Sequence, residues 1–158
     1  MENRFNLYSA IMEKLDYTFS DLPNFNEIEM KNLIIKDINL DNLISVKSKY
    51  SNIEFNCISL YSSYFVQTSF EECIFLNVDF TKSNLNNTSF TSCSFISCSF
   101  AGSEIMGAKI ITCIFKNCNF TNITFSDNII NDTQFEITDK SFSAISDNIE
   151  KNVVWLFD

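Results

Sequence analysis

The chain has little of what most enzymes and hairpin-rich β proteins need. Its 158 residues include no histidine, one proline and two glycines. The absence of histidine removes the usual general base and the commonest metal ligand, and no glycine-rich phosphate loop is present. So few turn formers also argue against a sandwich of tight hairpins. We therefore expect no catalytic residue, no cofactor and no metal site, and a fold whose turns are built into a repeating unit.

Positive charge and long apolar runs are scarce as well. There are 11 basic and 20 acidic residues, a net charge of −9, which disfavours direct binding to nucleic acid. No apolar run approaches membrane-spanning length, and the start MENRFNLYSA lacks the apolar core of a signal peptide. We expect one domain by size, in the cytoplasm, without membrane contact and with its six cysteines as reduced thiols.

What the chain does have is phenylalanine, 17 residues of it, in a five-residue register. A Phe, Leu or Ile recurs at every fifth position from 55 to 135, which fits neither the period of a helix nor that of an ordinary strand. A short internal repeat of this kind predicts a solenoid. The residues of the register are Phe55, Leu60, Phe65, Phe70, Phe75, Phe80, Leu85, Phe90, Phe95, Phe100, Ile105, Ile110, Phe115, Phe120, Phe125, Ile130 and Phe135.

The position two before each large residue is mostly small, so each quintet places a small and a large residue on the same side. This pattern resembles the pentapeptide repeat family, whose quintets follow the form Ala-(Asp/Asn)-Leu-X-X. Two segments come close to that form, Ser83-Asn84-Leu85-Asn86-Asn87 and Cys118-Asn119-Phe120-Thr121-Asn122. The resemblance covers at least residues 51–135, although the Asp/Asn step is lost at Ile74, Lys109 and Ile114.

The resemblance implies an all-β fold, a right-handed quadrilateral β-helix in which four quintets make one coil of 20 residues. Successive coils would stack at roughly 4.8 Å, the spacing of neighbouring strands. The register extends upstream over 26–50, which we interpret as a degenerate first coil with a bulge or loop near 41–50, because the register falters at Ser45. A separate small pair of strands is the alternative for this stretch.

The two ends of the chain follow a different spacing from the regular solenoid of 51–135. Apolar residues at 5, 8, 12, 15 and 19 are spaced as on an amphipathic helix, which Pro23 would end. We therefore predict an N-terminal helix within 1–22. Phe142, Ile145, Ile149, Val153 and Leu156 predict a C-terminal helix over 139–158 in the same way. Both would cap the solenoid, and the alternative for the C-terminal segment is a dimer interface.

Taking every fourth quintet sorts the residues onto four sides. We call side A the side whose inward large residues run from Phe55 to Phe135 in steps of 20, and side B the next side along the chain. The inward small positions of side A hold Cys73, Cys93 and Cys113, and those of side B hold Cys98 and Cys118. Buried cysteine acts as a small hydrophobe, so we expect these thiols to fill space. Cys57 falls at an outward position.

The outward positions of side B are polar, whereas side A presents Ile74, Leu76, Ile96 and Ile114. Exposed aliphatic residues on neighbouring coils are typical of an interaction site, unless the segment 5–19 folds back over them. The C-terminal Trp155, Leu156 and Phe157 are also more apolar than a surface needs. We predict a protein-interaction role for both groups, including a homodimer joined through the C-terminal segment, as in the head-to-head dimers of gyrase-binding relatives.

Two functions follow. The first is a rigid, non-enzymatic scaffold that binds another protein of unknown identity. The second is implied by the resemblance: some family members mimic duplex DNA and bind DNA gyrase or topoisomerase IV, conferring quinolone resistance or toxin immunity. Residues 51–135 carry seven acidic residues and three lysines, whereas duplex DNA as long as their rod, roughly 20 Å, would carry about 12 charges. Charge density therefore favours the scaffold.

Overall fold

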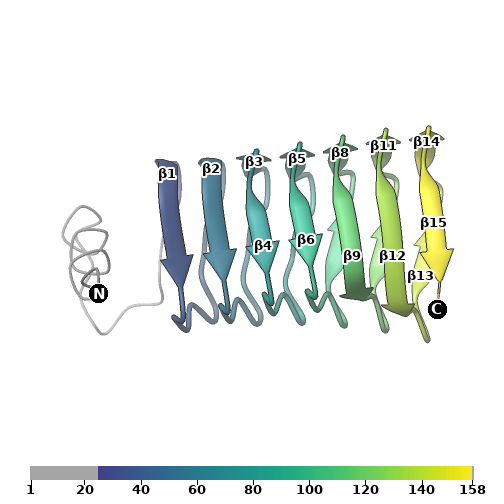
Figure 1. Cartoon of the computed structure of the whole chain (residues 1–158), viewed down its shortest axis with the longest axis horizontal. Helices are drawn as coiled ribbons and strands as arrows, with labels where there is room; N and C mark the ends of the chain where they lie inside the picture. Colours follow the sequence, from purple (N-terminus) through teal and green to yellow (C-terminus); the bar gives the residue numbers. More distant parts are fainter. Residues whose placement is uncertain (1–24, 158) are drawn as a thin grey trace.

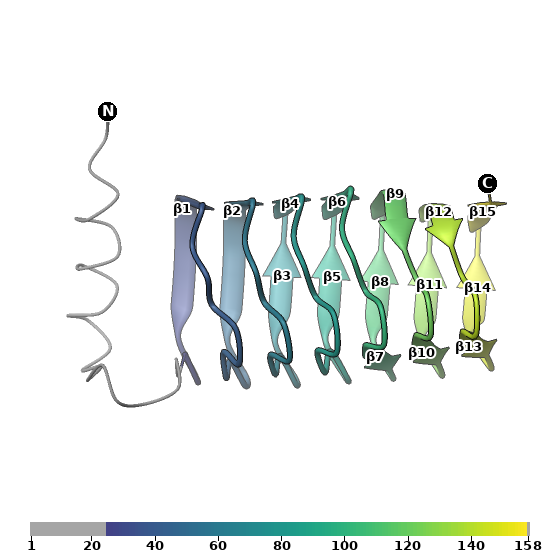
Figure 2. The ribbon, with the colours of Figure 1, turned by 90° about the horizontal axis from the view of Figure 1, so that it is seen from below.

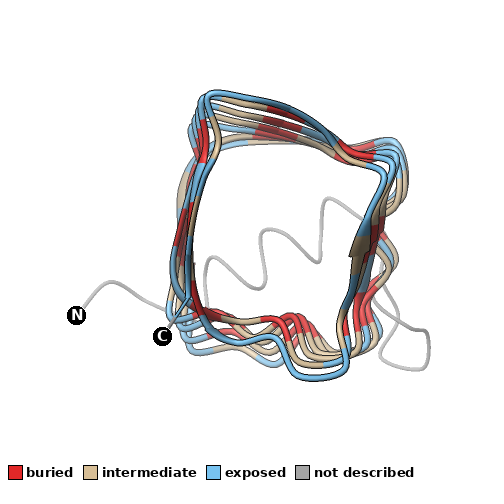
Figure 3. Ribbon diagram, turned by 90° about the vertical axis from the view of Figure 1, so that its right-hand side faces the viewer, coloured by how far each residue is buried: buried red, intermediate tan, exposed pale blue. Residues whose placement is uncertain are grey.

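The computed structural model describes residues 25–157, and the helix expected within 1–22 lies outside this range. The described chain winds into a square tube (Figures 1 and 3). All of its regular elements are short strands, and each residue pairs with its equivalent one coil further on, as in the pairs Met30–Tyr50 and Phe55–Phe75. The predicted all-β solenoid is confirmed, and it makes somewhat more than six coils.

The strands run parallel to their neighbours in adjacent coils, so each side of the square is one ladder (Figure 2). Side A carries β4, β6, β9, β12 and β15; we call the side with β7, β10 and β13 side C, and the side with β3, β5, β8, β11 and β14 side D. The longer β1 and β2 run from side D into side A, and side B is joined by single bridges such as Ser59–Asp79. The strand bounds are β1 Glu29–Lys36, β2 Lys49–Asn56, β3 Ser69–Glu71, β4 Ile74–Leu76, β5 Ser89–Thr91, β6 Ser94–Ile96, β7 Glu104–Met106, β8 Lys109–Ile111, β9 Ile114–Asn119, β10 Thr124–Ser126, β11 Ile129–Asn131, β12 Gln134–Asp139, β13 Ala144–Ser146, β14 Ile149–Lys151 and β15 Val154–Phe157.

The corners of the square are built from residues in the left-handed region. Every fifth residue from Glu27 to Asn152, apart from Ile137, has a φ between +50° and +65°. Asn, Asp and Gly adopt this conformation most readily, and they occupy many of these corners, including Gly102 and Gly107. The turns therefore need few glycines, because asparagine and aspartate serve at many corners where the backbone requires a positive φ.

The Asp/Asn step of the quintet has a local role on sides B and C. Its side chain accepts a hydrogen bond from the backbone N–H two residues on, at 2.9 Å from Thr81 to Asp79 and at 2.8 Å from Thr121 to Asn119. Such bonds stabilise a turn. Ile74, Lys109 and Ile114 begin the strands β4, β8 and β9, where no such bond is needed, and this explains why they depart from the family form.

The core is a set of aromatic columns inside the tube. On side A the rings of Phe55, Phe75, Phe95, Phe115 and Phe135 stack with centroids 4.4 to 4.9 Å apart. Rings on adjacent sides meet edge to face, as Phe90 and Phe95 do at 5.2 Å. Every large residue of the 55–135 register is buried, as the sequence predicts.

The first coil is present, but its predicted loop near 41–50 is wrong. Corner residues follow the five-residue spacing at Asn42 and Lys47, and Ser45 is fully buried at its inward position. The Tyr50 hydroxyl lies 2.6 Å from the Ser45 hydroxyl, so the larger tyrosine fills the space that the small serine leaves. The missing large residue at 45 is a substitution within the repeat rather than an interruption of it.

The predicted C-terminal helix over 139–158 is also wrong, because β13, β14 and β15 form another coil. The helical spacing is a coincidence: Phe142 is a corner residue that is 89% exposed, and Ile149 points outward from side D. The five-residue register in fact continues, with Lys140, Ile145, Glu150 and Trp155 at the inward positions. A terminal coil is covered on one side only, so it tolerates charges that an inner coil would exclude.

We predict that Phe95→Ala lowers the free energy of unfolding by roughly 3–5 kcal/mol, because Phe95 is fully buried and stacks on both Phe75 and Phe115. Urea unfolding monitored by circular dichroism measures the loss. Ser94→Ala, an outward change on the same strand, is the control and should unfold like the unmodified protein. Equal free energies of unfolding for the two variants would contradict the conclusion that the stacked Phe rings of side A stabilise the solenoid.

Candidate interaction surface

Side A is a flat parallel ladder with an outward aliphatic patch. Ile74 is 43% exposed and Ile114 is 49% exposed, and Leu76 on the same strand as Ile74 and Ile96 on the next strand are half-buried. Leu76 pairs directly with Ile96, whereas Ser94 lies between Ile74 and Ile114. The structure therefore brings the four predicted residues to one surface spanning three coils. We call these four residues the side A patch.

The patch belongs to a longer column in which apolar residues recur on alternate coils. Within one column of side A, Ile34, Ile74, Ile114 and Val154 are all exposed, and Glu54, Ser94 and Gln134 occupy the coils between them. Coils stack at about 4.8 Å, so the apolar ridges are roughly 10 Å apart. Ile34 is a member of this column that the sequence argument missed, although the coil-to-coil register identifies it.

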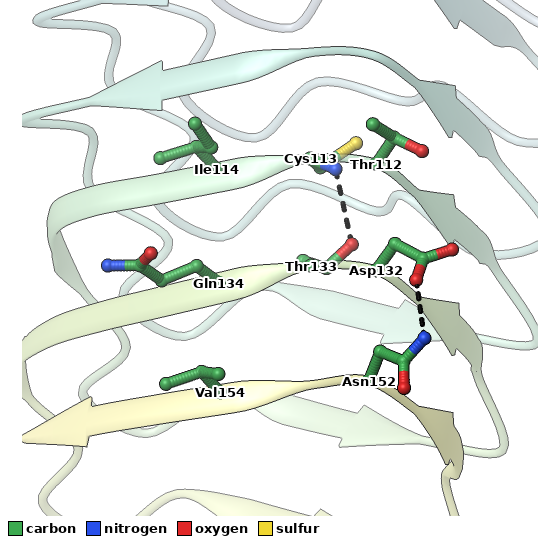
Figure 4. Close-up of a pocket in the computed structure, with 8 residues that line it drawn as sticks. All are labelled: Thr112, Cys113, Ile114, Asp132, Thr133, Gln134, Asn152 and Val154. Atoms are coloured by element: carbon green, nitrogen blue, oxygen red, sulfur yellow. Dashed lines mark hydrogen bonds between the residues drawn. The ribbon is translucent and has the colours of Figure 1, made fainter.

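A shallow groove of about 390 Å³ lies at the corner where the last three coils enter side A (Figure 4). Ile114, Gln134 and Val154 line one side of it, and Thr112, Asp132 and Asn152 line the other. The Asn152 amide donates a hydrogen bond of 2.8 Å to the Asp132 carboxylate. The groove continues the side A patch toward the C-terminus and adds hydrogen-bonding groups to it.

The C-terminal coil covers its own aromatic residues in part. Trp155 stacks on Phe135 with centroids 4.0 Å apart, and its indole N–H donates to both oxygens of Glu150 at 3.2 Å. The Lys140 ammonium lies 3.4 Å from the centroid of the Phe157 ring. Trp155 thus lies inward at the end of the rod together with Phe157, whereas Leu156 is 47% exposed on side A.

Sequence reasoning missed two further apolar surfaces. On side C, Tyr64 is 52% exposed and lies among half-buried aliphatic residues. On side D, Ile129 and Ile149 are adjacent and exposed. The signal that could have found both is the outward position of each quintet read in steps of 20. The half-buried neighbours of Tyr64 on side C are Ile44, Val46 and Val66.

The cysteines on sides A and B are buried, as predicted, and Cys57 is exposed. Their thiols contact backbone carbonyls of the preceding coil, for example Cys93 Sγ to Phe70 O at 3.4 Å. Hydrogen bonds with Cys113 and Cys73, followed by burial, raise the pKa of the Cys93 thiol above its usual range. Buried cysteines in a packed core of this kind act as structural, unreactive thiols.

Within residues 25–157 no group of three or more Cys, Asp or Glu side chains is placed to hold a metal ion. The same part of the chain contains no helix long and apolar enough to cross a membrane. What the described surface does offer is flat ladders, apolar ridges and amide or carboxylate groups. These groups are suited to contact with another macromolecule.

Comparison with the QnrB1 structures, whose TM-scores exceed 0.5, supports the fold. The chain is similar to full-length QnrB1, a plasmid-mediated fluoroquinolone resistance protein, with a TM-score of 0.54 at 14% identity over 82% of this chain and 93% of that chain. A trypsin-treated form of QnrB1 gives a TM-score of 0.51 at 9% identity over 84% and 79% of the two chains. A pentapeptide repeat protein, Rfr23 from the cyanobacterium Cyanothece 51142, is 13% identical over 95% and 97% with a TM-score of 0.32. No curated protein matches.

Quintets with a buried inward residue, four to a coil and stacked in one register, define the pentapeptide repeat fold, and this chain has that fold. Residues 23–120 match the family model described as the SV2A/B/C luminal domain, which covers more than half of the chain, and the chain belongs to that family. The description concerns the location of that domain in SV2 proteins and gives no compartment for this chain.

Proposed function

We propose that this protein is a non-enzymatic scaffold that binds another protein through side A. The observation that carries the proposal is the side A patch, whose Ile74 and Ile114 are nearly half exposed on a rigid, flat ladder. Isolated exposed aliphatic residues are ordinary, but a contiguous group on neighbouring coils is typical of an interaction surface. The groove beside Ile114 adds the polar groups that interfaces place around an apolar centre. The cytoplasm is the proposed compartment.

A photo-crosslinking residue placed at Ile96 should capture one protein from the native cell, identified by mass spectrometry. Adding Ile74→Asp and Ile114→Asp should abolish the crosslink, because buried unpaired charges oppose association. The same crosslinker at Ser99 on side B is the matched control and should capture nothing specific. Identical products from positions 96 and 99 would refute side A as the binding surface.

We also propose a homodimer joined end to end through the C-terminal coil. Lys140 lies at the inward position of side B and Glu150 at that of side D, the opposite side of the square. A two-fold axis perpendicular to the rod and passing through sides A and C would place Lys140 of one copy over Glu150 of the other. Trp155 would meet its own counterpart. Such isologous dimers are the commonest oligomers, and the two charge pairs select this orientation.

Charge reversal tests the dimer. Lys140→Glu or Glu150→Lys alone should give monomers by light scattering at micromolar concentration, because like charges would face each other across the axis. The double variant should restore the dimer. The full chain should be dimeric and a 1–152 truncation monomeric, since the truncation removes Trp155, Leu156 and Phe157. A monomeric full chain, or a double variant that fails to reassociate, would eliminate this arrangement.

A second candidate is the DNA mimic that binds DNA gyrase or topoisomerase IV, which the likeness in fold to QnrB1 favours. Charge argues against it. Residues 25–157 carry 15 acidic and nine basic side chains, a net charge of −6. Their rod is roughly 30 Å long at strand spacing, and duplex DNA of that length would carry about 17 charges. Acidic side chains also fall on all four sides rather than in two backbone-like rows.

We therefore expect no inhibition of DNA supercoiling by gyrase, or of decatenation by topoisomerase IV, when the protein is present at micromolar excess. The dimer, not the monomer, is the form to assay, because end-to-end joining doubles the length of the rod. Inhibition that disappears in the Ile74→Asp/Ile114→Asp variant would identify the topoisomerase as the partner that binds side A. Inhibition indifferent to those changes would support mimicry by the rod as a whole.

A further inference from the structure

The outward residues of side A form two columns along the rod. We number the rungs of side A by their inward residues, from rung 1 at Ile35 to rung 7 at Trp155. In the first column the apolar ridges occupy the odd rungs, and Glu54, Ser94 and Gln134 occupy the even rungs. In the second column aliphatic residues meet on rungs 3 and 4, between a lysine on rung 1 and charged residues on rungs 5 and 6. Read from rung 1 to rung 7, the second column consists of Lys36, Asn56, Leu76, Ile96, Lys116, Glu136 and Leu156.

A second copy of the chain, turned end for end, can face side A with column over column. The two-fold axis of such a pair lies in the interface and runs along the strands, so each column faces its own counterpart. The numbers of any two facing rungs then have a constant sum. Because the ridges lie on odd rungs, an odd sum places every ridge opposite a polar gap, whereas an even sum places ridge on ridge. An odd sum therefore lets the side chains of the two faces interdigitate, as they do between packed sheets.

The charged residues of side A distinguish one odd register from the others. When the sum is seven, Lys36 on rung 1 faces Glu136 on rung 6 of the second copy. Glu54 on rung 2 faces rung 5, where Lys116 occupies the neighbouring column. These four residues are the only charged ones in the two columns, so every charge lies beside an opposite charge of the second copy. Such complementarity fixes the register of an interface and excludes others.

The other odd registers place charge on aliphatic groups or bring fewer rungs together. A sum of nine sets Lys116 opposite Ile96, and a sum of five sets Lys36 opposite Ile96. Sums of three, eleven and thirteen bring four rungs or fewer together and leave Leu76 uncovered. A sum of seven instead places Leu76 against Ile96 of the second copy at the centre of the contact.

We propose that the partner of side A is a second copy of this chain, bound antiparallel in the register with a sum of seven. The proposal rests on the binding role proposed for side A and names the occupant of that surface. Rungs 1 to 6 of each copy are covered, and rung 7 projects beyond the second copy. The C-terminal coil with Trp155 therefore stays free, and the side A contact does not compete with the end-to-end contact.

The side A contact is small. A side of the square is about 17 Å wide, five residues at roughly 3.3 Å each, and six rungs extend over about 29 Å. The pair thus buries on the order of 1,000 Å² in total, less than the roughly 1,200 Å² at which stable interfaces begin. We expect a dissociation constant on the order of 100 µM. The end-to-end contact is therefore the one populated at micromolar concentration, and the side A contact forms at higher concentration.

Sedimentation equilibrium of the full chain tests the contact. Lys140→Glu, which should remove the end-to-end dimer, provides the background, and this variant should dimerise between about 10 and 500 µM. Adding Lys36→Glu should raise the dissociation constant roughly tenfold, because two ion pairs in each dimer become repulsive. Adding Glu136→Lys as well should restore association. Lys31→Glu, the same change on the side D part of β1, is the matched control and should leave association unchanged.

Crosslinking with a short bismaleimide tests the register. The background also carries Cys57→Ser, which removes the exposed thiol. Ile34→Cys/Gln134→Cys places two thiols opposite each other across the contact, although they lie five rungs, roughly 24 Å, apart within one chain. We expect this variant to give a covalent dimer at several hundred micromolar. Ile34→Cys/Ser94→Cys, with both thiols in the same column, is the control and should stay monomeric, because rung 4 faces rung 3.

The outcomes separate this proposal from the binding role of side A. A dimer that weakens and recovers with the charges and is joined through positions 34 and 134 supports the proposal. A monomer at the highest concentration, or a dimer joined through positions 34 and 94, overturns it. Capture of a different protein by the photo-crosslinker at Ile96, without association of the purified chain, would refute the second copy and leave the binding role intact. The absence of any product at Ile96, from cells and from the purified chain alike, would refute both.

Discussion

Each coil of this solenoid is held by the coils on either side of it, through two kinds of contact that share one register. Backbone N–H groups donate to carbonyls of the next coil, as Asp37 does to Asn56 at 3.0 Å, and aromatic rings stack on the equivalent rings of that coil, as Phe75 does on Phe95 at 4.6 Å. Both of these contacts join one coil to the next. The geometry of a coil therefore has to repeat closely, and this requirement fixes the inward residue, the corner residue and the flatness of side A together.

The inner coils could be read from the sequence because they are covered on both sides. A residue such as Phe95 has one acceptable environment, and only large apolar side chains fill it at native density. Burial on two sides therefore requires a large apolar residue at every fifth position, and this period is visible in the sequence. The same reasoning located Ile74, Leu76, Ile96 and Ile114 on one surface, because an outward position between two inward ones is fixed by the pleat. The identity of the binding partner is not encoded in such a pattern.

The structure of the ends could not be predicted in the same way, because an end coil is covered on one side only. The requirement for a large apolar residue at each inward position is therefore weaker there. Lys140 and Glu150 interrupt the apolar register in the last coil, because an inward residue with solvent on one side can be charged. Ile137 adds a second difficulty: the pairing of β12 with β9 shifts there, so Ile137 lies opposite Cys118, and the inward residue comes one position early. Ser45 concealed the regularity of the first coil for a third reason, the compensating hydroxyl of Tyr50.

The alternation along side A gives the rod two different units of length. A loss or gain of one whole coil would join one strand to its equivalent in the next coil and preserve the backbone ladder, the corners and the core. The same change would, however, bring Ile74 and Ile114 onto adjacent rungs or separate them by three. Only a step of two coils restores both the fold and the spacing of its apolar ridges. The length of this fold can thus vary more freely than its surface can, because a partner that contacts the ridges of side A would require them to be spaced by an even number of coils.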